Sequence, residues 1–149
     1  MKASPRILIA FLVVASALVL GFYLKIIRPG EAHARALERI ANVIHRHDRP
    51  LPPGLDYNSW HNYVGAVHDS VYNYFLRPQY YPTAKLEEIA AQFESKWPKG
   101  PQDTADIAAM LDLLVAARPD LADFTPVLAA RSWMKEEAGE KAAALPPGK

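Results

Sequence analysis

An unbroken apolar run near the N-terminus is the strongest constraint on how this chain can fold. The run Ile7–Leu24, ILIAFLVVASALVLGFYL, is 18 residues long and holds no charged side chain. A helix rises about 1.5 Å per residue, so this run covers about 27 Å of a hydrocarbon core that is about 30 Å thick. Continuing to Ile27 gives about 31 Å, provided that Lys25 extends its amine to the headgroups. The run therefore predicts a membrane-spanning helix.

Aromatic and basic side chains flank the predicted span. Aromatic rings and long basic side chains favour the boundary between hydrocarbon and water, where an apolar body and a polar tip are both solvated well. The residues that we expect at this membrane interface are Arg6, Phe22, Tyr23, Lys25 and Arg28. The lipid bilayer is accordingly the first expected partner of the chain.

A cleaved signal peptide is the competing interpretation of the same run. Lys2 and Arg6 form a basic head, and Ala15-Ser16-Ala17 resembles an A-x-A cleavage site. Cleavage there would leave LVLGFYL exposed at the new N-terminus. The run is also longer than the apolar region of about 7–15 residues in a usual signal peptide. We therefore favour an uncleaved, single-pass signal anchor.

Two observations point in opposite directions on membrane orientation. Basic residues stand on both sides of the run: Lys2 and Arg6 before it, and Lys25, Arg28, Arg35 and Arg39 after it. This count favours a cytoplasmic C-terminal domain. A short basic head before an apolar run, however, is the usual form of a signal anchor that exports the domain after it. We expect the C-terminal domain on the exported side, periplasmic or extracellular.

The distribution of charge narrows the class of partner. Residues 1–49 hold eight Lys/Arg and three Asp/Glu, a balance of +5, whereas residues 50–149 hold nine and thirteen, a balance of −4. A basic segment beside the membrane suits anionic headgroups. A nucleic-acid binder would instead show a basic face on its folded domain, so we expect no nucleic-acid partner.

Apolar periodicity predicts helices along the rest of the chain, with Pro29-Gly30 ending or kinking the membrane helix. The first two expected helices are Glu31–His47 and Trp60–Arg77, the second capped by Ser59. Thr83 is expected to cap a third helix that runs to Trp97, and Asp103 or Thr104 a fourth that runs to Ala117. After a single turn at Asp120–Phe124, the last helix is expected to begin at Thr125-Pro126. Their expected buried faces include Leu37, Ile40, Ala41 and Ile44; Leu86, Ile89, Ala90, Phe93 and Trp97; Ile107, Met110, Leu111, Leu114 and Val115; and Val127, Leu128, Arg131 and Met134.

No segment alternates apolar and polar residues as a half-buried strand does. The predicted fold class is therefore all-α: one N-terminal transmembrane helix followed by a juxtamembrane helix and a small helical bundle domain. The expected divisions are an anchor at 1–28, a juxtamembrane amphipathic helix at 29–49, a helical domain at 50–134 and a flexible tail at 135–149. The tail is expected to fray because KEEAGEKAAALPPGK has no apolar stripe. The pattern leaves open whether the juxtamembrane helix lies on the bilayer or packs on the domain.

The predicted helix Trp60–Arg77 carries two stripes instead of one. The main stripe holds Trp60, Val64, Val67, Val71, Tyr74 and Phe75, and a second one holds His61, Gly65, His68 and Tyr72. A helix at the edge of a domain needs only one apolar stripe. This helix is therefore either central in the bundle or presents its second face to a partner, with Gly65 permitting a close approach.

Six of the seven tyrosines lie between Tyr57 and Tyr81. Tyrosine is enriched in protein interfaces because it combines an apolar ring with a polar tip. Tyr74, like Trp60 and Phe75, is expected in the core. The residues that we expect to bind a partner are Gly65, Tyr72, Tyr80 and Tyr81.

The sequence offers no catalytic or metal motif that we recognise. G-x-S-x-G, H-E-x-x-H, the P-loop and G-x-G-x-x-G are all absent, and the chain has no cysteine for a thiolate. The five histidines are His33, His45, His47, His61 and His68. His61 and His68 are about 10.5 Å apart along a helix, too far to hold one metal ion by themselves. We expect solvated or capping histidines with His61 and His68 on an interface, no catalytic residue, no metal, no cofactor and no small-molecule substrate.

These observations favour a non-catalytic accessory, assembly or scaffold subunit of a larger membrane protein complex, whose other subunits are the expected protein partners. The alternative is a membrane-tethered domain that senses a ligand or a metal through His61 and His68. An enzyme with an unrecognised site is a third, weaker interpretation.

Overall fold

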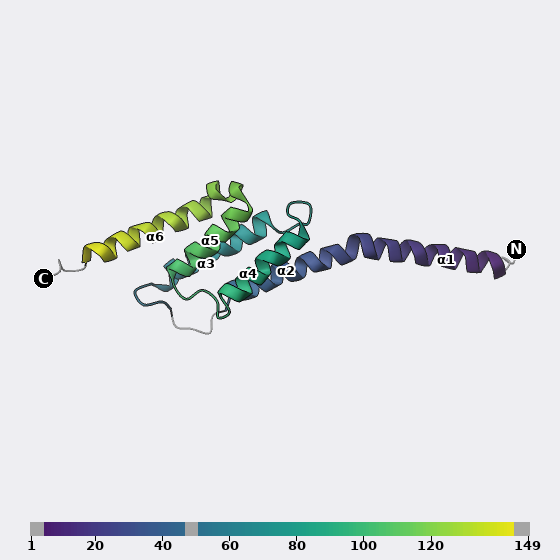
Figure 1. Ribbon diagram of the computed structural model, residues 1–149, viewed down its shortest axis with the longest axis horizontal. Coiled ribbons are helices and arrows are strands. Elements are labelled where there is room, and N and C mark those ends of the chain that lie inside the picture. The colour runs from purple at the N-terminus through teal and green to yellow at the C-terminus, as the bar shows by residue number, and fades with distance from the viewer. Residues whose placement is uncertain (1–4, 47–50, 145–149) are drawn as a thin grey trace.

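The computed structural model describes residues 5–46 and 51–144 (Figure 1). Across these residues it contains helices and no strand, which confirms the predicted all-α class. The elements in chain order are α1 (Pro5–Phe22), the π-helical turn η1 (Tyr23–Ile27), α2 (Arg28–Ile44), α3 (Tyr57–Tyr74), α4 (Thr83–Lys96), α5 (Thr104–Ala117), the 3₁₀ turn η2 (Pro119–Asp123) and α6 (Thr125–Ala144).

The apolar N-terminal segment forms a helix that is long and apolar enough to cross a membrane. None of its most apolar window is buried by the rest of the protein. Phe11, Val13 and Leu18, for example, are all exposed along α1. A stretch of this length with its apolar side chains facing outward on every side is what a lipid environment favours.

The apolar N-terminal helix does not end at Pro29-Gly30, contrary to one of the two outcomes expected there. Helix continues from Ile9 to Ile44, and the axis changes direction near η1 (Figure 1). The backbone N–H of Arg28 donates to the carbonyl of Tyr23, five residues back. Proline interferes with the bond to the carbonyl four residues back. A π turn directly before Pro29 shifts this pattern by one residue, so the chain continues as α2.

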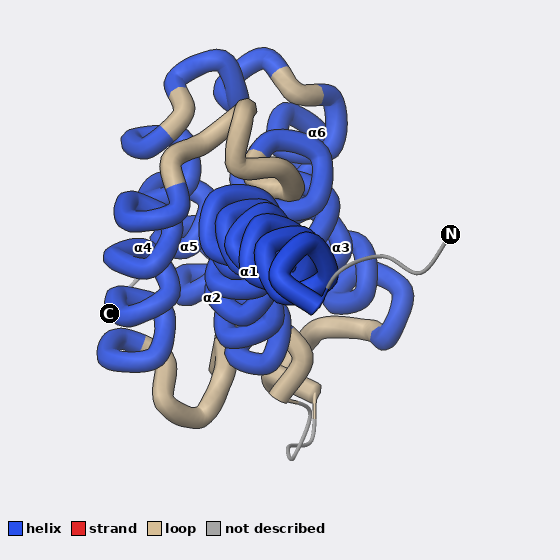
Figure 2. The backbone as a smooth tube through the Cα atoms, turned by 90° about the vertical axis from the view of Figure 1, so that its right-hand side faces the viewer, coloured by secondary structure: helices blue, strands red, loops and turns tan. Residues whose placement is uncertain are grey.

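The helix α2, predicted to be juxtamembrane, contributes to the domain core. α2 packs against α4 and α3, and Figure 2 shows it below the end-on α1 with α4 to one side and α3 to the other. Leu37, Ile40 and Ile44 are buried as predicted, whereas Ala41 is only partly buried and Val43 is fully buried. The question that the sequence left open is thus answered for this helix: it packs on the domain.

The remaining core follows the predicted faces of α4 and α5. Leu86, Ile89, Ala90, Phe93 and Trp97 are buried, and so are Ile107, Met110, Leu111 and Leu114, with Val115 packed beside them. The main stripe of α3 is also buried apart from the half-exposed Tyr74. Burial of one continuous stripe on each helix accounts for the compact arrangement of α2 to α6.

Two of the predicted helix caps are wrong. Asp56, not Ser59, caps α3: its Oδ1 accepts hydrogen bonds from the backbone N–H groups of Asn58 and Ser59, at 2.8 and 3.0 Å. These bonds, that of Ser59 foremost, lower the pKa of Asp56. The residue before α4 is Pro82, which offers no side-chain cap, and Thr83 bonds elsewhere. Asp103, one of the two predicted candidates, caps α5 and accepts from the backbone N–H of Asp106.

The last helix differs from its predicted face and length. Val127 and Ala130 are buried and Met134 packs on the core, while Leu128 and Arg131 are exposed. The buried face of α6, which packs on α3 and η2, is therefore rotated from the expected one and centres on Val127 and Ala130. α6 also continues to Ala144, so the fraying expected from Lys135 is not present in the described residues; residues 145–149 of the expected tail lie outside them.

Candidate functional site

Gly65 and Tyr72 lie on one face of α3, as the sequence predicts, and this face is at least partly exposed. A Cβ built on Gly65 would meet no atom within 4 Å, so the helix backbone is bare at this point. Tyr72 lies two turns further along and is 37% exposed. Between them stands His68, whose ring centroid is 4.5 Å from that of Tyr72.

A groove with a volume of about 660 Å³ runs beside this face. Trp60 and Val64 are its buried floor, and Tyr57 at its rim is largely exposed. The residues that line it are His45, Leu51, Tyr57, Trp60, His61, Val64, Gly65, His68 and Asp69. The groove thus combines an apolar floor with three imidazoles and one carboxylate at its edges.

Ring contacts organise the side chains of the groove. His45, just after the end of α2, lies with its ring centroid 5.1 Å from that of His68. His61 stacks on Tyr57, with centroids 5.9 Å apart and the planes inclined by 13°. The Nδ1 of His68 is 3.3 Å from a carboxylate oxygen of Asp69. The two histidines predicted to share a face of α3 therefore line one groove, with a third imidazole from the end of α2.

Metal ligation finds no support in this arrangement. Among the residues that the structure describes, no three His, Cys, Asp or Glu side chains stand close enough together to hold a metal ion. His47 lies outside the described residues. His33, expected to be solvated or capping, is 1% exposed and part of the interior.

A second, smaller groove lies on the other side of Gly65. Its volume is about 270 Å³, and it is bounded by Pro126, Ala129 and Trp133 of α6. It shares His61, Gly65 and Asp69 with the larger groove. The backbone at Gly65, which carries no side chain, therefore forms a low ridge that separates the two grooves. We call the exposed side of α3 formed by His61, Gly65, His68 and Tyr72 the α3 face.

Tyr80 and Tyr81 do not join the α3 face. Tyr81 is 8% exposed and packs edge-on against Phe75, with centroids 4.7 Å apart. Burial raises the pKa of the Tyr81 phenol. Tyr80 is exposed but belongs to the loop between α3 and α4. The sequence identified the aromatic cluster but did not separate these two neighbours, of which one faces inward and the other outward.

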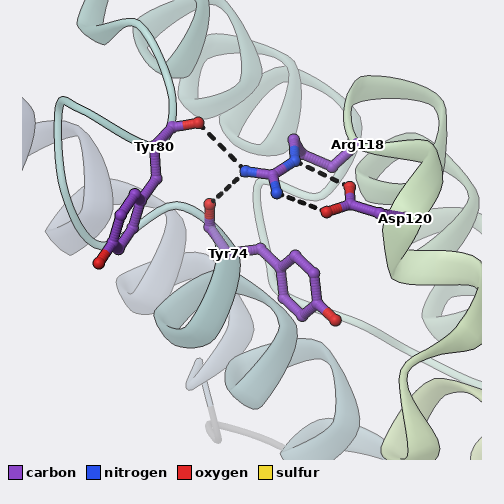
Figure 3. Close-up of polar contacts among 4 residues, drawn as sticks. All are labelled: Tyr74, Tyr80, Arg118 and Asp120. Carbon is purple, nitrogen blue, oxygen red and sulfur yellow. Dashed lines mark hydrogen bonds and ion pairs between the residues drawn. The ribbon is translucent and has the colours of Figure 1, made fainter.

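Arg118 holds the loop that carries Tyr80 (Figure 3). Its Nη1 donates to the carbonyls of Tyr74 and Tyr80, at 3.0 and 3.1 Å. Its Nε and Nη2 donate to the two carboxylate oxygens of Asp120, at 2.9 and 2.5 Å. This side-chain bonding lowers the pKa of Asp120 and raises that of Arg118. One guanidinium therefore joins the end of α3, the following loop and η2.

The expected membrane-interface residues lie where the sequence places them along the helix. Phe22, Tyr23, Lys25 and Arg28 are all exposed, at the end of α1, in η1 and at the start of α2. The side chain of Arg6 lies outside the described part of the structure.

No protein-family model matches this chain, and neither a curated protein nor a solved structure matches it.

Proposed function

We propose that this protein is a non-catalytic accessory subunit of a membrane protein complex, anchored by α1 and bound to a helix of a partner subunit through the α3 face. Two features of the chain support the proposal together. The N-terminal helix exposes apolar side chains on all sides, and the domain that follows it has an exposed, partly apolar face.

The continuity of α1, η1 and α2 supports a fixed position of the domain above the membrane. Because one face of α2 is buried against α3 and α4, the domain cannot turn freely about the end of the span. His45 lies 18 residues beyond Ile27, which is about 27 Å of helix. The groove beside His45 would therefore meet an extramembrane part of the partner.

The shape of the α3 face supports a helix as the occupant. The bare backbone at Gly65 lets another backbone approach closely, as small residues do where helices cross. Hollows lie on both sides of this ridge and would take side chains of the partner. Tyr57, Tyr72 and Trp133, all exposed around it, are residue types that dominate interface energetics.

Two matched glycine variants test the proposal. Gly65→Leu places a side chain of good helix propensity over the ridge without a clash at its Cβ, so the fold should persist. Gly139→Leu is the control, because Gly139 is also helical and open, but lies on α6 away from the groove. Native membranes extracted in mild detergent would be run on a native gel and probed for this chain.

The expected result is that the wild-type chain and Gly139→Leu migrate with a large assembly, whereas Gly65→Leu migrates as a small species with unchanged far-UV circular dichroism. Migration of the wild-type chain as a lone small species would refute the accessory-subunit proposal. Assembly of Gly65→Leu at the wild-type level would show that the α3 face is not the docking surface.

For orientation, we propose that the domain lies on the exported side of the membrane. The basic head before the apolar run supports this choice. A Lys99→Cys variant in this cysteine-free chain should react with a membrane-impermeant maleimide in intact cells. Labelling only after lysis would place the domain in the cytoplasm.

The groove also favours a second candidate, a membrane-tethered domain that binds a small organic ligand. Its volume lies within the range of about 300–1,000 Å³ that is typical of ligand sites, and an apolar floor with few polar groups is their usual lining. Native mass spectrometry of the full chain in detergent should then show a bound molecule that His61→Ala loses and Lys99→Ala retains. A purified chain of bare mass that binds neither organic molecule nor added zinc would exclude this candidate.

A further inference from the structure

The loop between α3 and α4, residues 75–82, lies at the end of the domain nearest α1 (Figure 1). In the view along α1 this loop is in front of the helical bundle (Figure 2). His33, near the start of α2, fixes it there. The Nε2 of His33 lies 2.6 Å from the carbonyl oxygen of Phe75, and its Nδ1 lies 3.1 Å from the hydroxyl of Thr83.

The helix geometry sets the height of this loop above the bilayer core. His33 is six residues beyond Ile27, the last residue of the apolar stretch, which corresponds to about 9 Å along the helix. Each headgroup layer of a bilayer is about 5–8 Å thick. A loop tied to His33 and extending back toward α1 therefore reaches the headgroup level.

The exposed side chains of the loop suit that environment. Leu76 is 44% exposed and Tyr80 is 54% exposed, although both are largely apolar. The guanidinium carbon of Arg77 lies 5.9 Å from the centre of the Tyr80 ring. Aromatic rings with a polar tip and arginine side chains are the groups that favour the membrane–water boundary.

Exposed cations lie on both the loop and the start of α2, and the nearby Glu31 faces Arg35, 4.0 Å away. Lys25 and Arg28 are exposed on the adjacent helix, and Arg77 adds a third cation from the loop. Arg118, in contrast, is bound by Asp120 and by two carbonyls, so its role is to hold the loop. Cations next to a bilayer surface attract anionic headgroups.

We propose that residues 76–80 form a second membrane contact, in which Leu76 and Tyr80 enter the headgroup layer of the bilayer that α1 spans while Arg77 binds anionic lipid phosphates. This inference rests on the span by α1 and is independent of any partner on the α3 face. It implies that the domain stands on the membrane at two points and not on α1 alone.

Site-directed spin labelling of the full chain in vesicles tests this contact. The chain has no cysteine, so Leu76→Cys and Tyr80→Cys each give one labelling site. Lys99→Cys is the aqueous control, in the exposed turn between α4 and α5, and Val13→Cys on α1 is the lipid control. Collisions of each label with oxygen, which concentrates in lipid, and with a water-soluble nickel chelate report its surroundings.

In vesicles of phosphatidylcholine and phosphatidylglycerol, labels at 76 and 80 should lose nickel accessibility and gain oxygen accessibility relative to the label at 99. If they match the label at 99 while the label at 13 is in lipid, the second contact is refuted and the span stands. If the label at 13 is also aqueous, both are refuted.

The role of Arg77 has its own readout. Protection of the label at 80 should increase when phosphatidylglycerol is added to phosphatidylcholine, and Arg77→Gln should lose this increase. An equal response to phosphatidylglycerol in the Arg77→Gln variant would overturn the assignment of Arg77 to lipid phosphate.

Discussion

The imidazole of His33 bonds the backbone carbonyl of Phe75 through a contact of 2.6 Å between Nε2 and the carbonyl oxygen. A carbonyl only accepts, so Nε2 carries the hydrogen. In the neutral imidazole, Nδ1 then accepts from the hydroxyl of Thr83, 3.1 Å away. One buried side chain on the first half of α2 thereby secures the end of α3 and the start of α4.

Replacing His33 with alanine should destabilise the domain. The carbonyl of Phe75 would lose its buried partner, which costs about 1–3 kcal/mol, and the part-buried hydroxyl of Thr83 would lose a smaller contribution. Urea unfolding in detergent, followed by circular dichroism, should show a lower midpoint. His61→Ala is the control, since His61 is exposed, and a similar midpoint for the two variants would contradict the role of His33.

Gly100→Ala should also destabilise the fold, for a backbone reason. Gly100 has a φ of 75°, and a Cβ there would lie 2.9 Å from the Cβ of Arg46 and 3.0 Å from the carbonyl oxygen of Val43. Alanine in this conformation should cost more than about 1 kcal/mol. Gly139→Ala, in an open helical position, should be neutral or stabilising, and equal melting temperatures for the two variants would count against this packing.

The ion pair between Arg39 and Glu94 should make stability depend on acid pH. Arg39 donates two hydrogen bonds to Glu94, at 3.0 and 2.6 Å, and this bonding lowers the pKa of Glu94. A carboxylate with a lowered pKa contributes stability above its unfolded value of about 4.3, and this contribution is lost as the pH falls through the lower folded value.

Glu94→Gln should therefore have a lower melting temperature than the wild-type chain at neutral pH. The two melting temperatures should converge as the pH falls below about 4. Both side chains are partly exposed, so the difference at neutral pH should be small and should shrink in high salt. A difference in melting temperature that stays constant across this pH range would show that the charge of the Glu94 carboxylate is not its cause.

Tyr63→Phe should loosen α6 from α3. The buried Tyr63 donates from its hydroxyl to Oε1 of Glu137 at 2.6 Å, and burial raises the pKa of this phenol, which keeps it a donor. Loss of one hydrogen bond to a charged acceptor costs about 1.5–3 kcal/mol. Amide hydrogen exchange should become faster in α6, whereas Tyr57→Phe, at an exposed ring, should leave it unchanged.

The helices and most of their buried faces were predictable because each depends on a local period. The faces of α4 and α5 and the Asp103 cap follow from residues within a few turns of one another. The continuity of the helix through Pro29 was harder to predict, because it depends on the backbone hydrogen bonds of a π turn and not on an apolar period.

The features that were not predictable depend on residues far apart in the chain. The sequence around His33 does not show that this residue is buried, because its partners Phe75 and Thr83 are more than 40 residues away in the chain. The groove, likewise, needs His45 from the end of α2 beside His68 from α3. The sequence did place Gly65 and Tyr72 on one stripe, because that relationship is set within a single helix, but it left open whether the stripe is exposed.

The most direct test of the account is photo-crosslinking from the α3 face in native membranes. A photoreactive amino acid at position 72 should yield one defined adduct with a membrane-complex subunit, whereas the same group at the exposed position 128 on α6 should not. The adduct should disappear when Gly65→Leu is added and persist with Gly139→Leu. Equal adducts from positions 72 and 128, or an adduct from 72 that survives Gly65→Leu, would contradict a partner helix on this face.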